Sequence, residues 1–108
     1  MASLDAVIEE RVKKALEILS RHARISAAYV FGSRVEGRVH EFSDIDIGVF
    51  IEDLEEWDLR RKARTAALVQ KEAGDDIELH FLPAQTLSHA EPASLAAFII
   101  RHGIPIHN

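Results

Sequence analysis

Residues 44–51 constrain the fold more than any other part of the chain, because an isoleucine or a valine stands at every second position. Isoleucine and valine occupy one set of alternate positions, and the other set consists of Asp44, Asp46, Gly48 and Phe50. Successive side chains of a β-strand point to opposite faces of its sheet. We therefore predict a core strand that carries two carboxylates on one face, about 6–7 Å apart along it.

Two carboxylates on a strand with strongly apolar neighbours need a physical reason to be there. Burying both charges would be costly unless a cation compensated them. Carboxylate oxygens are the ligands that Mg²⁺ prefers, and water and phosphate oxygens complete its coordination. Asp44 and Asp46 therefore indicate a divalent metal site, with a solvated strand edge as the simpler alternative.

Length and composition limit the class of protein. The 108 residues suffice for one domain, which we expect to span residues 1–108. With 47% apolar and 29% charged residues, the chain is typical of globular rather than disordered proteins. A net charge of −5 argues against direct nucleic-acid binding through a broad basic surface. The absence of cysteine excludes disulfides and cysteine-based zinc sites.

The hydropathy of the chain carries an expectation about its location. The first residues lack the apolar run of a signal peptide. No stretch approaches the roughly 20 apolar residues of a membrane span. We therefore expect a cytoplasmic protein that makes no use of a membrane.

Hydrophobic periodicity and turn residues predict the remaining elements. We expect helices over residues 4–22, 54–73 and 94–102, strands over 25–31, 44–51 and 77–82, a loop over 32–43 and a short edge strand at 104–106. Ser3 is the expected cap of the first helix, and Gly74 and Gly103 are the expected ends of the second and third. This order predicts an α/β (α+β) fold, in which a small mixed β-sheet has its helices packed on one face.

A glycine-serine turn stands where the first predicted strand ends. Gly32 allows the backbone to approach a phosphate closely, and Ser33 offers a hydroxyl and an N–H to it. Arg34 follows directly, and its guanidinium is suited to neutralising phosphate charge. These residues indicate an anion-binding turn, with an ordinary strand-to-loop turn as the alternative.

The third predicted strand adds further polar side chains. Its apolar positions are Ile77, Leu79 and Phe81, which leaves Asp76, Glu78 and His80 on the opposite face. If the sheet aligns this face with the aspartate pair, Asp76 or Glu78 becomes a third carboxylate. Three carboxylates can hold two metal ions about 3.5–4 Å apart, the arrangement that assists an in-line phosphoryl displacement. We interpret His80 as a structural or exposed residue.

Taken in order, these parts resemble a known signature. The run Phe31-Gly32-Ser33-Arg34, then Gly37, then Ser43-Asp44-Ile45-Asp46-Ile47 is similar to the motif of the polymerase-beta-like nucleotidyltransferases. In that motif a Gly-Ser pair stands ahead of Asp-x-Asp in the next strand. Gly-Ser-Arg with Ser-Asp-Ile-Asp is most similar to the minimal nucleotidyltransferases, which are small bacterial and archaeal proteins. The order of elements and the size extend the resemblance to nearly the whole chain.

The resemblance implies a fold, a reaction and a nucleotide site. The fold is that of the polymerase-beta-like nucleotidyltransferases, and the reaction transfers AMP from ATP to a hydroxyl, with release of pyrophosphate. By position, Gly32 and Ser33 would hold the triphosphate of ATP. Arg34 and Ser43 are further nucleotide-binding candidates within the matching run.

The resemblance also implies a two-metal magnesium site. By position, Asp44 and Asp46 would bind the Mg²⁺ ions and act as catalytic residues. The third carboxylate would serve the metal beside the nucleophile and help to deprotonate it. Glu78 is our choice for that role. The family more often has aspartate there, and Asp76 lies on the same predicted face, so both residues remain candidates.

Partners are implied in the same way. Minimal members of the family commonly pair with a small helical protein of the HEPN type, as antitoxin and toxin. The resemblance implies such a partner, which would be silenced by AMP transfer to a tyrosine. One alternative is a non-catalytic antitoxin, a binding module that neutralises its partner by occlusion, and another is a nucleotidyltransferase for a small molecule. Apolar residues near the C-terminus, Leu95, Phe98, Ile99 and Ile100, are compatible with a homo- or hetero-oligomer.

Overall fold

The computed structural model describes residues 4–32 and 44–107 of the chain. In chain order the elements are α1 (Ala6–Ser20), β1 (Ile25–Phe31), β2 (Ile45–Ile51), the 3-10 helix η1 (Leu54–Glu56), α3 (Leu59–Ala73), β3 (Ile77–Pro83), the 3-10 helix η2 (Ala84–Leu87), α4 (Leu95–His102) and β4 (Ile104–Pro105). The helices and strands expected from the sequence are therefore present, and η2 is an addition. Within the described ranges, no helix combines the length and the hydropathy that a membrane span requires.

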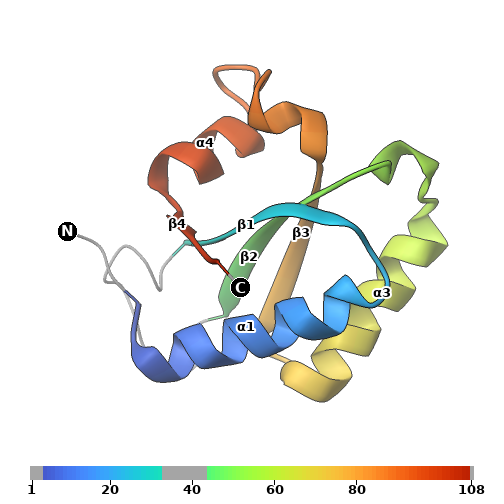
Figure 1. Ribbon diagram of the computed structural model, residues 1–108, viewed down its shortest axis with the longest axis vertical. Helices are drawn as coiled ribbons and strands as arrows, with labels where there is room; N and C mark the ends of the chain where they lie inside the picture. The colour runs from blue at the N-terminus through green and yellow to red at the C-terminus, as the bar shows by residue number, and fades with distance from the viewer. Residues whose placement is uncertain (1–3, 33–43, 108) are drawn as a thin grey trace.

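The strands form one mixed sheet. Their order across it is β3-β2-β1-β4. β1 runs antiparallel to β2 and to β4, whereas β2 and β3 are parallel and are joined through α3 (Figure 1). Parallel neighbours need a long crossover of this kind, because a tight hairpin would reverse the direction of the chain. The predicted fold class, a small α+β structure with a mixed sheet, is confirmed.

One face of the sheet is covered by the two long helices. The buried residues on this side come from α1, from α3 and from the isoleucine-valine face of β2, and they include Val12, Leu16, Leu19, Val69, Ile45, Ile47, Val49 and Ile51. The apolar stripe of each helix thus meets the alternating apolar positions of the strand. This layer is the larger part of the core.

The other face of the sheet is covered by α4, so the expectation that the helices pack on one face is wrong for this helix (Figure 1). Ala96 and Ile99 of α4 belong to a second buried cluster with Phe31, Phe50 and Leu82. These three strand residues would expose large apolar surface without a cover, which explains the position of α4. Gly48 permits the close approach, since a Cβ there would lie 2.8 Å from Ile99 Cδ1.

The side chain of Asp5 caps the beginning of α1. The carboxylate of Asp5 accepts a hydrogen bond of 2.8 Å from the backbone N–H of Val7. A carboxylate in this position satisfies a helix N–H that has no partner within the helix. The expected cap, Ser3, lies outside the described residues.

The helix expected over residues 54–73 is divided in two. Trp57 adopts an extended conformation between η1 and α3, and its ring is 7% exposed. The guanidinium of Arg61 lies over this ring, 4.0 Å from its centre. Asp58 then caps α3 by accepting a hydrogen bond of 2.8 Å from the N–H of Arg61. The helical backbone is therefore interrupted at Trp57, whose side chain is buried. The spacing of apolar residues alone does not predict this interruption.

Candidate metal and nucleotide site

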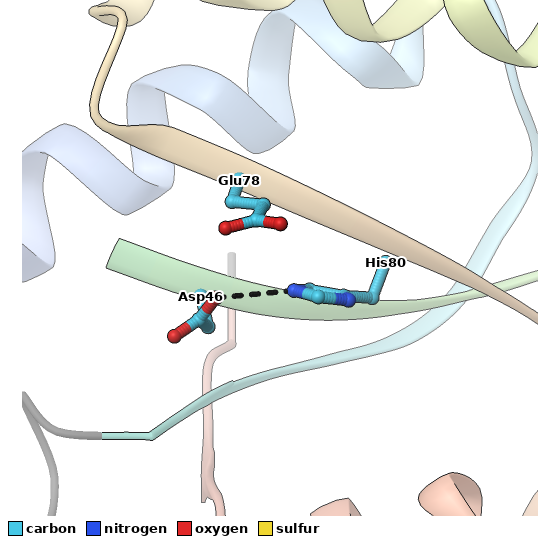
Figure 2. Close-up of side chains that lie close together, drawn as sticks. All are labelled: Asp46, Glu78 and His80. Atoms are coloured by element: carbon cyan, nitrogen blue, oxygen red, sulfur yellow. Dashed lines mark hydrogen bonds and ion pairs between the residues drawn. The ribbon is translucent and has the colours of Figure 1, made fainter. Parts of the chain in front are cut away.

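The register of the two parallel strands brings two carboxylates together. Asp46 of β2 is paired with Glu78 of β3, and Gly48 is paired with His80. Paired residues project from the same face of a sheet, which here is the face that α4 covers. The potential ligand atoms of Asp46, Glu78 and His80 all lie within 4.8 Å of one another (Figure 2). We call these three residues the acidic-histidine cluster.

A direct contact joins two members of the cluster. His80 Nε2 lies 3.1 Å from Asp46 Oδ1, within hydrogen-bonding distance. The side chains of His80 and Asp46 are 27% and 23% exposed, respectively, whereas Glu78 is classed as exposed. Asp46 and His80 are therefore half-buried and in contact with each other, whereas Glu78 is open to solvent.

Gly32 lies against the same carboxylate. Its φ of 87° is in the region that residues with a side chain rarely adopt. A Cβ on Gly32 would be 2.6 Å from Asp46 Oδ2, so a side chain at this position would displace the carboxylate. The end of β1 therefore passes directly beside Asp46, which places Gly32 and a candidate metal ligand at one point of the structure.

Of the two candidates for the third carboxylate, the structure places only Glu78 in the cluster. Asp76 lies before β3 and pairs with Arg11 of α1 through both carboxylate oxygens, one of them 2.8 Å from Arg11 Nη1. The hydrogen bond from Arg11 to Asp76 raises the pKa of the guanidinium, against the opposing effect of burial. Arg11 also donates to the carbonyl of Ala73 at 3.1 Å. Asp76 therefore fastens α1 to the turn before β3.

The remaining predicted site residues fall elsewhere. Asp44 is exposed, precedes β2, and is not a member of the acidic-histidine cluster. Ser33, Arg34 and Ser43 lie outside the described residues, so their assignment to the nucleotide site stays a prediction. Of the predicted residues, the structure thus brings together Gly32, Asp46 and Glu78.

The sequence pattern gave no role to His80, although the signal was present. Alternation along the third strand already placed His80 on the face of Glu78. The pattern within one strand does not show which residue of the neighbouring strand is paired with His80. Because that partner is Gly48, no side chain separates the imidazole from Asp46 or from Phe31 of β1, whose ring centre is 5.0 Å from that of His80.

The donor set fits a divalent cation. Ligand atoms around one octahedral ion lie about 3–4 Å apart, since each metal–oxygen bond is about 2.1 Å. The spread of up to 4.8 Å in the cluster is close to this value, and rotation of the exposed Glu78 side chain can reduce it. Two carboxylates at this separation repel each other without a cation, so an ion between them relieves the repulsion. Asp46, Glu78 and His80 can therefore hold a metal.

Comparison with known proteins identifies the family. The family model described as "Polymerase beta, Nucleotidyltransferase" matches residues 13–108. The crystal structure of a candidate nucleotidyltransferase from Sulfolobus solfataricus is similar, with a TM-score of 0.53 and 19% sequence identity over 82% of this chain and 84% of that one. None of the curated proteins matches the sequence significantly. Because the family model spans nearly all of the chain and the solved structure shares its fold, the chain belongs to the polymerase-beta-like nucleotidyltransferases.

Proposed function

We propose that the chain is a nucleotidyltransferase that uses a divalent metal to transfer AMP from ATP to a hydroxyl. The observation that supports this function is the meeting of Asp46 and Glu78 from adjacent parallel strands, beside the glycine turn at Gly32. The family to which the chain belongs transfers nucleotidyl groups, and a metal bridging such carboxylates suits that reaction. ATP as donor and Mg²⁺ as metal are implied by the resemblance to the minimal members.

The chemistry divides into a few roles for the protein. The hydroxyl oxygen of the acceptor attacks the α-phosphorus of ATP, the bond to the β-phosphate oxygen breaks, and pyrophosphate leaves. A divalent cation, when bound, supplies positive charge to the phosphate oxygens and favours ionisation of the hydroxyl. Asp46 and Glu78 would hold that ion, and Glu78, the exposed member, would accept the hydroxyl proton.

The backbone at Gly32 has its own role in this proposal. With no side chain on Gly32, the Asp46 carboxylate lies against the backbone at this residue, so a phosphate bound by that backbone would lie close to a metal held by Asp46. Ser33 and Arg34, next in the sequence, would donate hydrogen bonds to the triphosphate. This arrangement would align the α-phosphate with the metal, which lowers the entropic part of the barrier.

For the acceptor, we propose a tyrosine hydroxyl on a HEPN-type helical toxin, with this chain as its antitoxin. The basis is the resemblance of Gly-Ser-Arg and Ser-Asp-Ile-Asp to the minimal nucleotidyltransferases. Leu95 of α4 is 48% exposed and lies on the helix that covers the face carrying Asp46. An apolar side chain open to solvent on this helix is compatible with contact to a protein acceptor.

A transfer assay tests both levels of the proposal. The chain is incubated with ATP labelled at the α-phosphate and divalent metal, with and without the product of the neighbouring gene, and label on that product is measured. We expect Asp46→Asn to lower the rate by more than about a hundredfold, because loss of a residue that merely supports a metal ligand already costs about 10- to 100-fold. Glu55→Gln, an exposed acid on η1, is the matched control and should leave the rate unchanged.

The outcomes separate the alternatives. Label that appears on the partner and is lost with Asp46→Asn supports the enzyme and its acceptor. A tight complex without label would contradict transfer and favour an antitoxin that acts by occlusion. Transfer that proceeds at full rate in Asp46→Asn would show that the acidic-histidine cluster is not the active site.

A further inference from the structure

His80 is the member of the acidic-histidine cluster that the proposed transfer reaction does not use. Its Nε2 lies 3.1 Å from Asp46 Oδ1, and the potential ligand atoms of His80, Asp46 and Glu78 gather within 4.8 Å. Figure 2 shows the imidazole pointing from β3 toward the Asp46 carboxylate, with Glu78 beside both. The nitrogen therefore stands where a metal held by the two carboxylates would meet it.

The orientation of the imidazole is fixed by its neighbours in the sheet. His80 is paired with Gly48, so its ring can lie across the middle strand without meeting a side chain. Phe31 of β1 contacts the ring from beyond that strand, with 5.0 Å between ring centres and 62° between ring planes. Phe31 in turn contacts Phe98 of α4 at 6.4 Å between ring centres. Because Asp46 of β2 and Phe31 of β1 both contact the imidazole, little entropy is lost when its nitrogen binds an ion.

The kind of donor decides which metal binds best. Mg²⁺ prefers oxygen ligands in an octahedral arrangement, and it exchanges water for nitrogen reluctantly. Imidazole nitrogen suits first-row transition metals, whose affinity for a mixed nitrogen and oxygen site rises along the series from Mn²⁺. Asp46, Glu78 and His80 offer two carboxylates and one imidazole. Such a set binds Mn²⁺ and its heavier neighbours more tightly than it binds Mg²⁺.

We propose that His80 is a nitrogen ligand of the metal and makes this site selective for a first-row transition metal ion, such as Mn²⁺, over Mg²⁺. The inference rests on the proposed function, because it concerns the metal that the transfer would employ. It differs from the oxygen-only site implied by the sequence motif. His80 would thereby determine the metal specificity of the reaction without contacting the nucleotide.

The test measures metal binding rather than activity. Mn²⁺ is titrated into the full chain and free Mn²⁺ is followed by electron paramagnetic resonance, first alone and then in competition with Mg²⁺. Pulsed measurements on the bound Mn²⁺ detect a directly coordinated nitrogen. The variant is His80→Phe, which keeps an aromatic ring against Phe31 and removes the nitrogen. His102→Phe is the matched control, since His102 is exposed and contacts Phe98 with its ring, outside the cluster.

We expect nitrogen coupling in the unmodified chain and in His102→Phe, and none in His80→Phe. The Kd for Mn²⁺ should rise by about 10- to 100-fold or more in His80→Phe, while the Kd for Mg²⁺ changes by no more than about twofold. Bound Mn²⁺ without nitrogen coupling, an equal loss of both metals, or no Mn²⁺ binding at all would overturn the inference. Thermal unfolding of each variant confirms that it is folded.

The two proposals can fail separately. Nitrogen coupling without nucleotidyl transfer would support the role of His80 and contradict the proposed reaction. Transfer that is supported equally by Mg²⁺ and Mn²⁺, and is unchanged in His80→Phe, would support the reaction and contradict the role of His80.

Discussion

Replacement of Gly32 by alanine tests the contact between Gly32 and the Asp46 carboxylate, the proposed metal ligand. The Cβ added by this substitution has two separate effects, one on the backbone of residue 32 and one on the Asp46 carboxylate. A residue with a side chain at φ 87° costs about 1–2 kcal/mol, because its Cβ crowds the carbonyl oxygen that follows. The added Cβ would also lie 2.6 Å from Asp46 Oδ2, so the carboxylate must move away.

The first effect lowers the free energy of unfolding, and the second lowers the affinity for the metal. Asp46 is partly exposed, so its carboxylate rotates at small cost, and the free energy of unfolding falls mainly by the backbone term of about 1–2 kcal/mol. For a protein of this size, each kcal/mol lowers Tm by about 4–8 °C. Rotation of Asp46 removes it from the acidic-histidine cluster, and metal affinity falls in addition to stability.

Thermal unfolding with and without Mn²⁺ separates these losses. Metal at about 100 times its Kd stabilises a folded protein by about 2.7 kcal/mol, and a tenfold weaker affinity reduces this gain to about 1.4 kcal/mol. We expect that reduction, or a larger one, in Gly32→Ala. Gly74→Ala is the control, because Gly74 also has a positive φ, of 128°, and its Cβ would crowd Arg11 and the carboxylate of Asp76, which both lie outside the cluster.

Gly74→Ala should lose at least as much stability, because its Cβ also disturbs the Arg11–Asp76 pair, and it should keep the full gain from the metal, since Asp76 lies outside the cluster. Retention of the whole metal-dependent gain in Gly32→Ala, or an equal loss of it in both variants, would contradict the expected role of the contact between Gly32 and Asp46. The first result would mean that Asp46 does not bind the metal from the position seen here. The second would mean that the loss reflects general destabilisation.

Two further predictions concern the elements that support the site. Ile99→Ala should lower the free energy of unfolding by about 2–5 kcal/mol, because this fully buried side chain fills the space between α4 and Gly48. Urea denaturation measures the change. A loss below about 1 kcal/mol would contradict the packing of Ile99 against Gly48. Asp58→Ala should cost about 0.5–2 kcal/mol by removing the cap of α3. Asp58→Asn retains a capping oxygen and should recover most of that loss, whereas equal losses in both variants would exclude capping as the cause.

Patterns within single segments were sufficient to predict most of the fold. Alternation over residues 44–51 identified an inner strand, its buried isoleucine-valine face and the opposite face, on which Asp46 lies. The same reasoning found the strand at residues 77–82 and the helices on either side of it. Each of these features depends on neighbours along the chain, because side-chain direction follows the local backbone geometry.

Contacts between segments were harder to predict. The rule that placed Glu78 on one face placed Asp76 there as well, since the two residues differ by one strand repeat. Asp76 precedes β3 and turns instead to Arg11 of α1. Periodicity within one strand cannot reveal an ion pair with a helix that lies 65 residues away in sequence.

The position of α4 is a similar case. Its apolar stripe was visible in the sequence, but a stripe does not specify which face of the sheet it covers. Phe50 and Leu82 decided this, because they leave a second apolar face that α1 and α3 do not reach.

The sequence by itself determined the elements, the family signature and the side of the strand on which Asp46 lies. Only the tertiary structure decided which residues join Asp46. The parallel register of β2 and β3 selected Glu78, and the missing side chain of Gly48 opened the way for His80. The physical reason is that a strand fixes the direction of its own side chains, whereas hydrogen bonds between strands fix which of those side chains meet.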